Sequence, residues 1–165
     1  MNVIIFGPPG AGKGTQALNI VKKFKLYQIS TGDLLRNEVR NQTNIGKDIE
    51  NIISKGDFAT DEIVNELIKN EIFNPRNKNK LIFDGYPRSL SQAKNLDFLL
   101  SNSNQKIDFI FFLNVKKETV IDRIEKRKVI EKRTDDNLTT ILKRYDTYME
   151  TTKPVLEFYS KKANF

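Results

Sequence analysis

The chain has 165 residues, a formal net charge of +7 at pH 7, and 38% hydrophobic residues. This length and apolar content suit one globular domain with its own core. The absence of cysteine and histidine excludes disulfides, thiolate metal sites and imidazole catalysis, so acid–base chemistry would have to use Asp, Glu, Lys or water. We expect a cytoplasmic protein, because the sequence has neither a signal peptide pattern nor an apolar run long enough to span a membrane.

A short apolar run, Val3–Phe6, leads directly into the glycine-rich segment GPPGAGKGT at 7–15, and an amphipathic helical pattern follows. A strand, a glycine turn and a helix in this order are the context of a phosphate-binding loop. Glycines let successive backbone N–H groups turn toward an anion, and the helix N-terminus adds its positive end. Lys13 can then reach the outer phosphates of a nucleotide. Gly14 separates this lysine from Thr15, which argues against direct metal ligation by a loop hydroxyl.

The next segments predict a second strand over 26–29 and then three helices. Ser30-Thr31-Gly32-Asp33 is a helix-start cluster in which Thr31 is the candidate N-cap. Isoleucines at 45, 49, 52 and 53 mark the second helix, which Lys55-Gly56 closes. Thr60 caps the third helix, and residues 74–80 form a polar loop.

Two more strands follow, each leading to a helix. Leu81–Phe83 runs into Asp84-Gly85-Tyr86-Pro87-Arg88 and a helix from about 89 to 100. Residues 107–113 form a strand that is apolar on both faces, which is typical of a parallel sheet covered by helices on each side. Helices over 116 to about 127 and about 137 to 160 complete the chain. This alternation predicts a three-layer, doubly wound α/β domain, with a ligand crevice beyond the carboxyl ends of its strands.

Polar clusters end three of the strands, and in this fold they converge. The crevice would then contain Lys13 together with the charged residues Asp33, Arg36, Asp84 and Arg88. Carboxylates beside a phosphate loop suit Mg²⁺, which keeps several waters and is bound by one or two carboxylates plus phosphates.

Four more arginines lie downstream, at 123, 127, 133 and 144. A guanidinium binds phosphate through two hydrogen bonds, and phosphoryl transfer needs positive charge around the transferred group. Any one of these arginines could simply be a solvated surface residue, but six arginines with one P-loop lysine favour a phosphoryl-transfer site.

The motifs GPPGAGKGT, ISTGDLLR, TDE, DGYPRSLSQA, DRIEKR and RTDD, followed by Arg144, resemble those of adenylate kinases in order and spacing over nearly the whole chain. The resemblance implies the P-loop nucleoside monophosphate kinase architecture and the reaction Mg·ATP + AMP ⇌ 2 ADP. It implies a single kinase domain over 1–165, with an AMP-binding flap at 30–59 and a short lid at 126–136. It also implies a Mg²⁺ cofactor, no zinc, and the nucleotides ATP, AMP and ADP as partners of a monomer, without nucleic acid or membrane.

The resemblance further implies a role for each matching residue. Lys13, Arg88, Arg127, Arg133 and Arg144 would be catalytic, and Mg²⁺ would be held through water by Asp84 with Asp33 nearby. ATP would be bound by the loop residues Gly10, Ala11, Gly12, Lys13, Gly14 and Thr15, with Arg127, and its adenine would stack on Arg123. AMP would be bound by Thr31, Arg36, Asp57, Ala59, Gly85, Arg88, Gln92, Arg133 and Arg144.

Members of the family continue with a fifth parallel strand and a final helix, which this chain is expected to lack, so that residues 107–113 would become an exposed sheet edge. Two alternatives within the fold stay open. A UMP/CMP kinase is disfavoured by Thr31 and Gln92, and a truncated, non-catalytic ATP-binding remnant is disfavoured by the full set of arginines. A basic nucleic-acid-binding domain rests only on the net charge, and its marker would be steeply salt-dependent binding.

Overall fold

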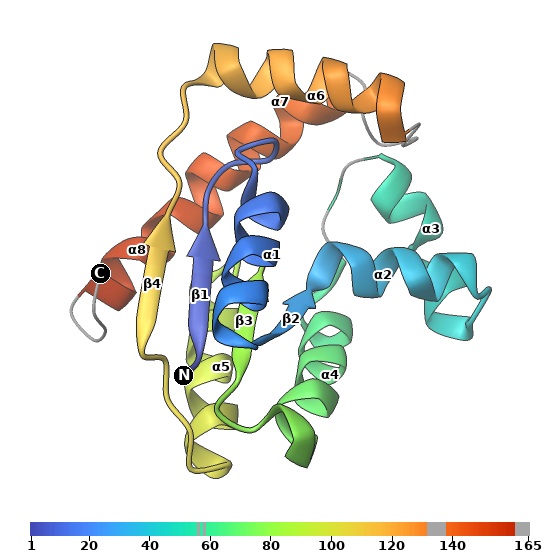
Figure 1. Cartoon of the computed structure of the whole chain (residues 1–165). Helices are drawn as coiled ribbons and strands as arrows, with labels where there is room; N and C mark the ends of the chain where they lie inside the picture. Colours follow the sequence, from blue (N-terminus) through green and yellow to red (C-terminus); the bar gives the residue numbers. More distant parts are fainter. Residues whose placement is uncertain (56, 58, 132–137, 161–165) are drawn as a thin grey trace.

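The computed structural model describes residues 1–55, 57, 59–131 and 138–160 (Figure 1). The strands are β1 (Val3–Phe6), β2 (Tyr27–Ser30), β3 (Leu81–Asp84) and β4 (Phe109–Phe112). The helices are α1 (Lys13–Phe24), α2 (Thr31–Arg40), α3 (Asn44–Ser54), α4 (Asp61–Ile72), α5 (Leu90–Asn102), α6 (Lys117–Glu131), α7 (Leu138–Thr147) and α8 (Lys153–Ser160), with a 3₁₀ turn η1 (Pro75–Asn77) and a π turn η2 (Tyr148–Thr152).

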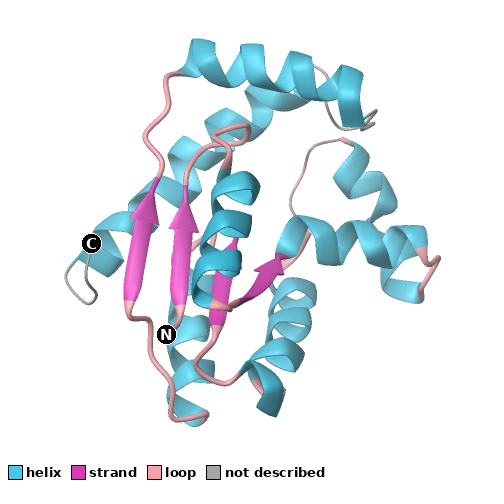
Figure 2. Cartoon of the chain, viewed as in Figure 1, coloured by secondary structure: helices cyan, strands magenta, loops and turns pink. Residues whose placement is uncertain are grey.

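The four strands form one parallel sheet in the order β2-β3-β1-β4 (Figure 2). The predicted α/β class is therefore confirmed. Because all strands run the same way, their carboxyl ends meet at one edge of the sheet. Figure 1 shows α6 passing above this edge, while α2 and α3 extend to one side of it.

Helices cover the sheet on two sides, which makes the three predicted layers. On one side α1 packs through Ala17 against Val3, Ile5 and Ile82. On the other side α4, α5 and α8 pack against the alternate strand residues, among them Ile4 and Phe83. Strands apolar on both faces are thus buried between helices, as parallel sheets require.

Strand β4 differs from the prediction of burial on both faces. Its register pairs Val3 with Phe109 and Ile5 with Phe111, so both phenylalanines face the side of the sheet that α1 covers. Helix α1 packs mainly on β1, β2 and β3. Phe109 and Phe111 therefore remain 40% and 43% exposed, and only Ile110 is buried.

Three local predictions need correction or completion. The N-cap of α2 is Ser30, whose hydroxyl accepts from the Asp33 N–H at 3.3 Å, and not Thr31. Thr60 occupies the N-cap position of α4 without a capping hydrogen bond from its side chain. The single long helix expected from about 137 is interrupted by the π turn η2 between α7 and α8. Gly56, the expected C-cap of α3, lies outside the described residues.

Helices of the length and hydropathy that a bilayer crossing requires are not found in the described part of the chain.

Candidate functional site

A cavity of about 1030 Å³ lies at the carboxyl ends of the strands. Every site residue expected from the sequence lines this cavity, with the exception of Arg133, which lies outside the described residues. The lining comes from segments far apart in the chain: the loop before α1, helix α2, the turn after β3, and helices α6 and α7. The fold thus brings together the clusters that the sequence presents separately.

The loop between β1 and α1 has the backbone of an anion nest. Gly10 and Gly12 have φ of +75° and +91°, which side chains rarely tolerate. A Cβ on Gly10 would lie 2.7 Å from Cγ1 of Ile124, so only glycine lets helix α6 approach the loop this closely. Gly12 is also the N-cap of α1 and has no side chain to cap it. The N–H groups at this helix start are placed to bind phosphate oxygens.

Lys13 reaches back over the loop. Its ammonium group donates to the carbonyl oxygens of Gly7 and Pro8 at 2.9 and 3.0 Å. Burial lowers the pKa of Lys13 to about 8; the Asp84 carboxylate opposes this shift, and the charges of Arg88 and Arg127 add to it. A bound polyphosphate would remove this repulsion between cations, so the site is electrostatically prepared for an anion.

Asp84, at the end of β3, is a carboxylate that lies close to the loop. A Cβ on Gly14 would lie 3.7 Å from Oδ2 of Asp84, and the same oxygen accepts from Nε2 of Gln28 at 3.1 Å. Burial raises the pKa of Asp84, against the effects of Lys13 and Arg88, and the nearby charge of Asp33 raises it further.

Gln28 was not predicted as a site residue. Its closeness to Asp84 can be recognised only when the register of the sheet is known. Strand β2 pairs directly with β3, and Ser30, two residues after Gln28, lies opposite Asp84. Asp33 forms an ion pair with Arg36 one turn further along α2, at 2.5 Å. Carboxylate oxygens beside a phosphate loop are the donors that Mg²⁺ prefers, so Asp84 and Asp33 fit the expected cofactor. Groups of three or more metal-ligating side chains do not occur among the residues described.

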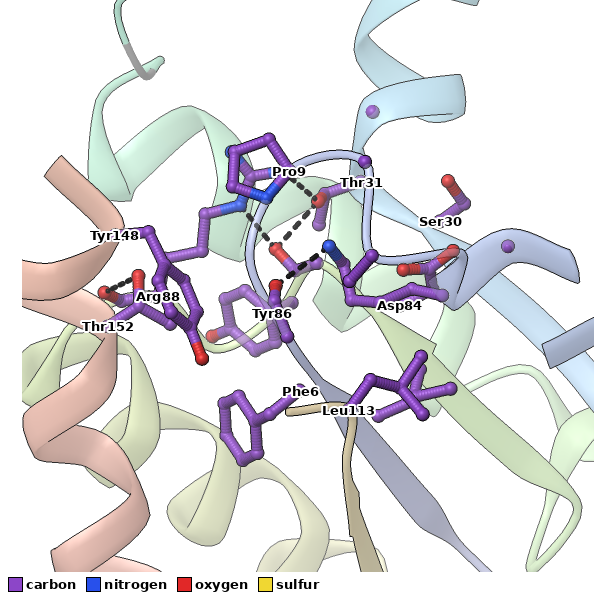
Figure 3. Close-up of a pocket in the computed structure, with 18 of the residues that line it drawn as sticks. Phe6, Pro9, Ser30, Thr31, Asp84, Tyr86, Arg88, Leu113, Tyr148 and Thr152 are labelled. Carbon is purple, nitrogen blue, oxygen red and sulfur yellow. Dashed lines mark hydrogen bonds between the residues drawn. The ribbon is translucent and has the colours of Figure 1, made fainter. Parts of the chain in front are cut away.

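Arg88 is fixed by the turn that follows β3 (Figure 3). Its Nε donates to the Gly85 carbonyl at 2.7 Å, and its Nη2 lies 3.4 Å from Oγ1 of Thr31. The Thr31 hydroxyl donates to the same carbonyl at 2.8 Å. Gly85 has φ of +78°, and a Cβ there would lie 2.9 Å from both the guanidinium and the hydroxyl. Glycine is therefore required at this turn for Arg88 and Thr31 to meet.

Gln92, expected to contact AMP, is buried and held by two hydrogen bonds. Its Oε1 accepts from the Arg88 backbone N–H, and its Nε2 donates to Oδ1 of Asp61, both at 2.7 Å. The other carboxylate oxygen of Asp61 accepts from the hydroxyls of Ser91 at 2.8 Å and Ser89 at 3.3 Å. Asp61 thus fixes which way the Gln92 amide faces. Asp61 lies in the first turn of α4, where an acidic side chain also interacts favourably with the helix dipole.

The remaining arginines enter from α6 and α7. Arg123 donates to the Ala11 carbonyl of the loop at 2.9 Å, so in this structure its guanidinium holds the loop. Arg127 and Arg144 line the cavity. Asp57, between α3 and α4, forms an ion pair with Lys143 of α7 at 2.5 Å. This ion pair joins Asp57, which lines the cavity, to helix α7.

Comparisons of the sequence with known proteins identify the family of this chain. The sequence model of the family described as "Adenylate kinase" matches residues 5–164. An adenylate kinase of Pelagibacter ubique (strain HTCC1062) is 48% identical over 191 residues, covering 100% of this chain and 90% of the relative. Adenylate kinases of Azobacteroides pseudotrichonymphae and Thermobifida fusca are 44% and 39% identical, with 99% of this chain and 85% and 86% of the relatives covered. With a family match over almost its entire length, the chain belongs to the adenylate kinase family.

Proposed function

We propose that the cavity binds ATP and AMP together and transfers the γ-phosphoryl group of ATP to AMP, giving two ADP. The observation that carries this proposal is that Lys13 of the loop, Arg88 of the β3 turn and Arg127 and Arg144 of the two C-terminal helices all line one cavity. Cations from three directions around a phosphate nest suit an in-line transfer between two phosphate groups.

The ATP half of the site is the loop before α1. Its N–H groups and Lys13 bind the β- and γ-phosphates, with Gly10, Ala11, Gly12, Gly14 and Thr15 forming the loop itself. Arg123 is proposed to cover the adenine of ATP. In this role the guanidinium donates its hydrogen bond to the Ala11 carbonyl in the plane of the group, while the adenine stacks on the face of the same plane.

The AMP half is formed by α2, the β3 turn and α5. Arg36 and Arg88 bind the AMP phosphate, Arg36 after exchanging its present partner Asp33 for the more highly charged phosphate. The base lies against Thr31, Gln92 and the main chain at Asp57 and Ala59. Gln92 keeps one amide N–H and one oxygen lone pair beyond its two protein bonds, and these favour a base that offers both an acceptor and a donor, as adenine does.

Phosphoryl transfer breaks the bond from the γ-phosphorus to the ADP leaving oxygen and forms a bond to an AMP phosphate oxygen. Arg88, Arg127, Arg133 and Arg144 balance the charge on the oxygens of the transferred group. Asp84, with Asp33, would hold the waters of a Mg²⁺ ion, which supplies further positive charge at the ATP phosphates.

A flap over 30–59 and a short lid over 126–136 close the cavity, which excludes water as an unwanted acceptor. We expect the enzyme to act as a cytoplasmic monomer that requires neither zinc nor nucleic acid.

The test is ³¹P NMR of the purified chain with Mg·ATP and, in separate samples, AMP, CMP, UMP and GMP. We expect rapid formation of ADP with AMP alone, and none in the same sample after chelation of Mg²⁺. Faster turnover of UMP or CMP would assign the chain to the pyrimidine alternative. Binding of ATP without turnover of any acceptor would refute the proposal in favour of a non-catalytic nucleotide-binding protein.

A further inference from the structure

Arg88 is held at its main chain as well as at its guanidinium. Its N–H donates to Gln92 of α5 at 2.7 Å, and its carbonyl oxygen accepts from the Thr152 hydroxyl at 3.0 Å. Thr152 comes from the π turn η2, 64 residues further along the chain. The position of the Arg88 backbone is therefore set jointly by α5 and by the C-terminal helical segment.

Three threonines of this segment allow a direct comparison. A threonine inside a helix ordinarily donates its hydroxyl to the carbonyl four residues earlier. Thr147 does so to Lys143 at 2.9 Å, and Thr151 does so to Thr147 at 2.8 Å. Thr152 instead donates across the cavity wall to Arg88, and it is only 5% exposed. Its bond is thus a tertiary contact and not a local helix bond.

The π turn explains why Thr152 can make this contact. The Lys153 N–H donates to the Tyr148 carbonyl, five residues back, in place of the usual four. Tyr148 and Thr152, the first and last residues of this turn, both line the cavity. Figure 3 shows both side chains beside Arg88. Single π turns inside α-helices occur frequently at functional sites.

The contact also opposes an electrostatic force. Arg144 lies one helical turn before Tyr148 and lines the same cavity, and its charge, after the effect of burial, lowers the pKa of Arg88, which is about 10. Two guanidinium groups on facing elements repel each other until an anion lies between them. A hydrogen bond from η2 to the Arg88 main chain holds the two elements together despite this repulsion.

We propose that Thr152 is a positioning residue for phosphoryl transfer, which acts by holding the Arg88 main chain so that its guanidinium faces Arg144 across the transferred group. The proposal rests on the proposed catalytic role of Arg88. It adds that Thr152 is the residue of this turn through which the C-terminal helical segment positions Arg88.

The experiment compares steady-state kinetics of Thr152→Val, Thr152→Ser and the matched control Thr151→Val. We expect Thr152→Val to lower kcat about tenfold, because misplacing an aligned catalytic group costs far more than the bond itself, while KM for ATP stays within about twofold. Thr152→Ser keeps the hydroxyl and should retain most of kcat. Thr151→Val loses a hydroxyl from the exposed side of the same turn and should match the unmodified enzyme.

A double-mutant cycle with Arg88→Ala separates positioning from general stability. If Thr152 acts through Arg88, then Thr152→Val causes no further loss of kcat in the Arg88→Ala background. Additive losses, or equal losses in the Ser and Val variants, would overturn the inference. If Arg88→Ala itself retains full kcat, the proposed role of Arg88 fails, and that result is distinct from a failure at Thr152 alone. Should Thr152→Val prove unfolded by circular dichroism, Thr152→Ala enters the same cycle.

Discussion

Replacing Gly46 by alanine should destabilise the packing of α3 on α2, within the proposed AMP-binding flap. Gly46 is buried in the first turn of α3, where the helix crosses the end of α2. A Cβ at this position would lie 2.0 Å from the Glu38 carbonyl oxygen and 2.8 Å from the Val39 nitrogen. These are backbone atoms, so no side-chain rotation can relieve the clash.

Two effects compete, and their magnitudes decide whether Gly46→Ala raises or lowers the free energy of unfolding. Alanine is favoured over glycine inside a helix by roughly 1 kcal/mol. Non-bonded heavy atoms pack best at ~3.5 Å, so the two backbones must separate by about 1.5 Å from the 2.0 Å that the Cβ would otherwise have. Overpacking of this kind costs ~1–3 kcal/mol or more, and rigid backbone puts Gly46→Ala at the upper end. We expect a net loss of about 2 kcal/mol in the free energy of unfolding.

For a chain of this size such a loss lowers Tm by about 4–8 °C, measured by circular dichroism. Since α2 and α3 carry the proposed AMP site, KM for AMP should rise several-fold while KM for ATP changes little. The control is Asn51→Ala, an exposed position on the same helix, which should change stability by less than ~0.5 kcal/mol. A Gly46→Ala protein as stable as the unmodified chain would refute the reasoning, because helix propensity would then outweigh the clash.

Three further predictions concern the cavity. The Lys13 amine, with its pKa of about 8, is partly neutral at pH 8.5 and should regain its proton when phosphate binds. The heat of ATP binding at this pH, measured by calorimetry, should therefore vary with the ionisation enthalpy of the buffer in the sense of proton uptake, and this variation should disappear in Lys13→Met. Asp61→Ala should raise KM for AMP about tenfold, as expected for hydrogen bonds to a charged group, by releasing the Gln92 amide; an unchanged KM would contradict this. Gln28→Leu removes a hydrogen bond that lowers the pKa of Asp84, so the acid limb of the pH profile of kcat should move to higher pH; an unmoved acid limb would contradict this.

The sequence predicted those features that depend on local pattern. The strand, glycine turn and helix of the phosphate loop follow one another in the chain, and the segment GPPGAGKGT directly indicates phosphate binding. Apolar runs such as Leu81–Phe83 indicated buried parallel strands. Because parallel strands share one edge for their carboxyl ends, the convergence of Lys13, Asp84 and Arg88 on one cavity followed from the fold class alone.

Features that depend on tertiary placement were beyond local pattern. Hydrophobic periodicity indicates a helix but cannot distinguish a π turn within it, so the role of Thr152 could not be predicted. Ser30 and Thr31 are chemically equivalent caps, and only the contact of Thr31 with Gly85 decides between them. The exposure of Phe109 follows from the position of α1 on the sheet. This position cannot be predicted from the residues of β4.

The edge of the sheet at β4 has a consequence for how the protein behaves in concentrated solution. Within the described residues β4 pairs only with β1, which leaves a row of backbone N–H and C=O groups beside Phe109 and Phe111. Such an edge can add an extended segment of another molecule. The net charge of +7 makes molecules repel one another, but salt at ~0.15 M limits this repulsion to about 8 Å. Colloidal stability should therefore fall as ionic strength rises, and storage at low salt should keep the protein monodisperse.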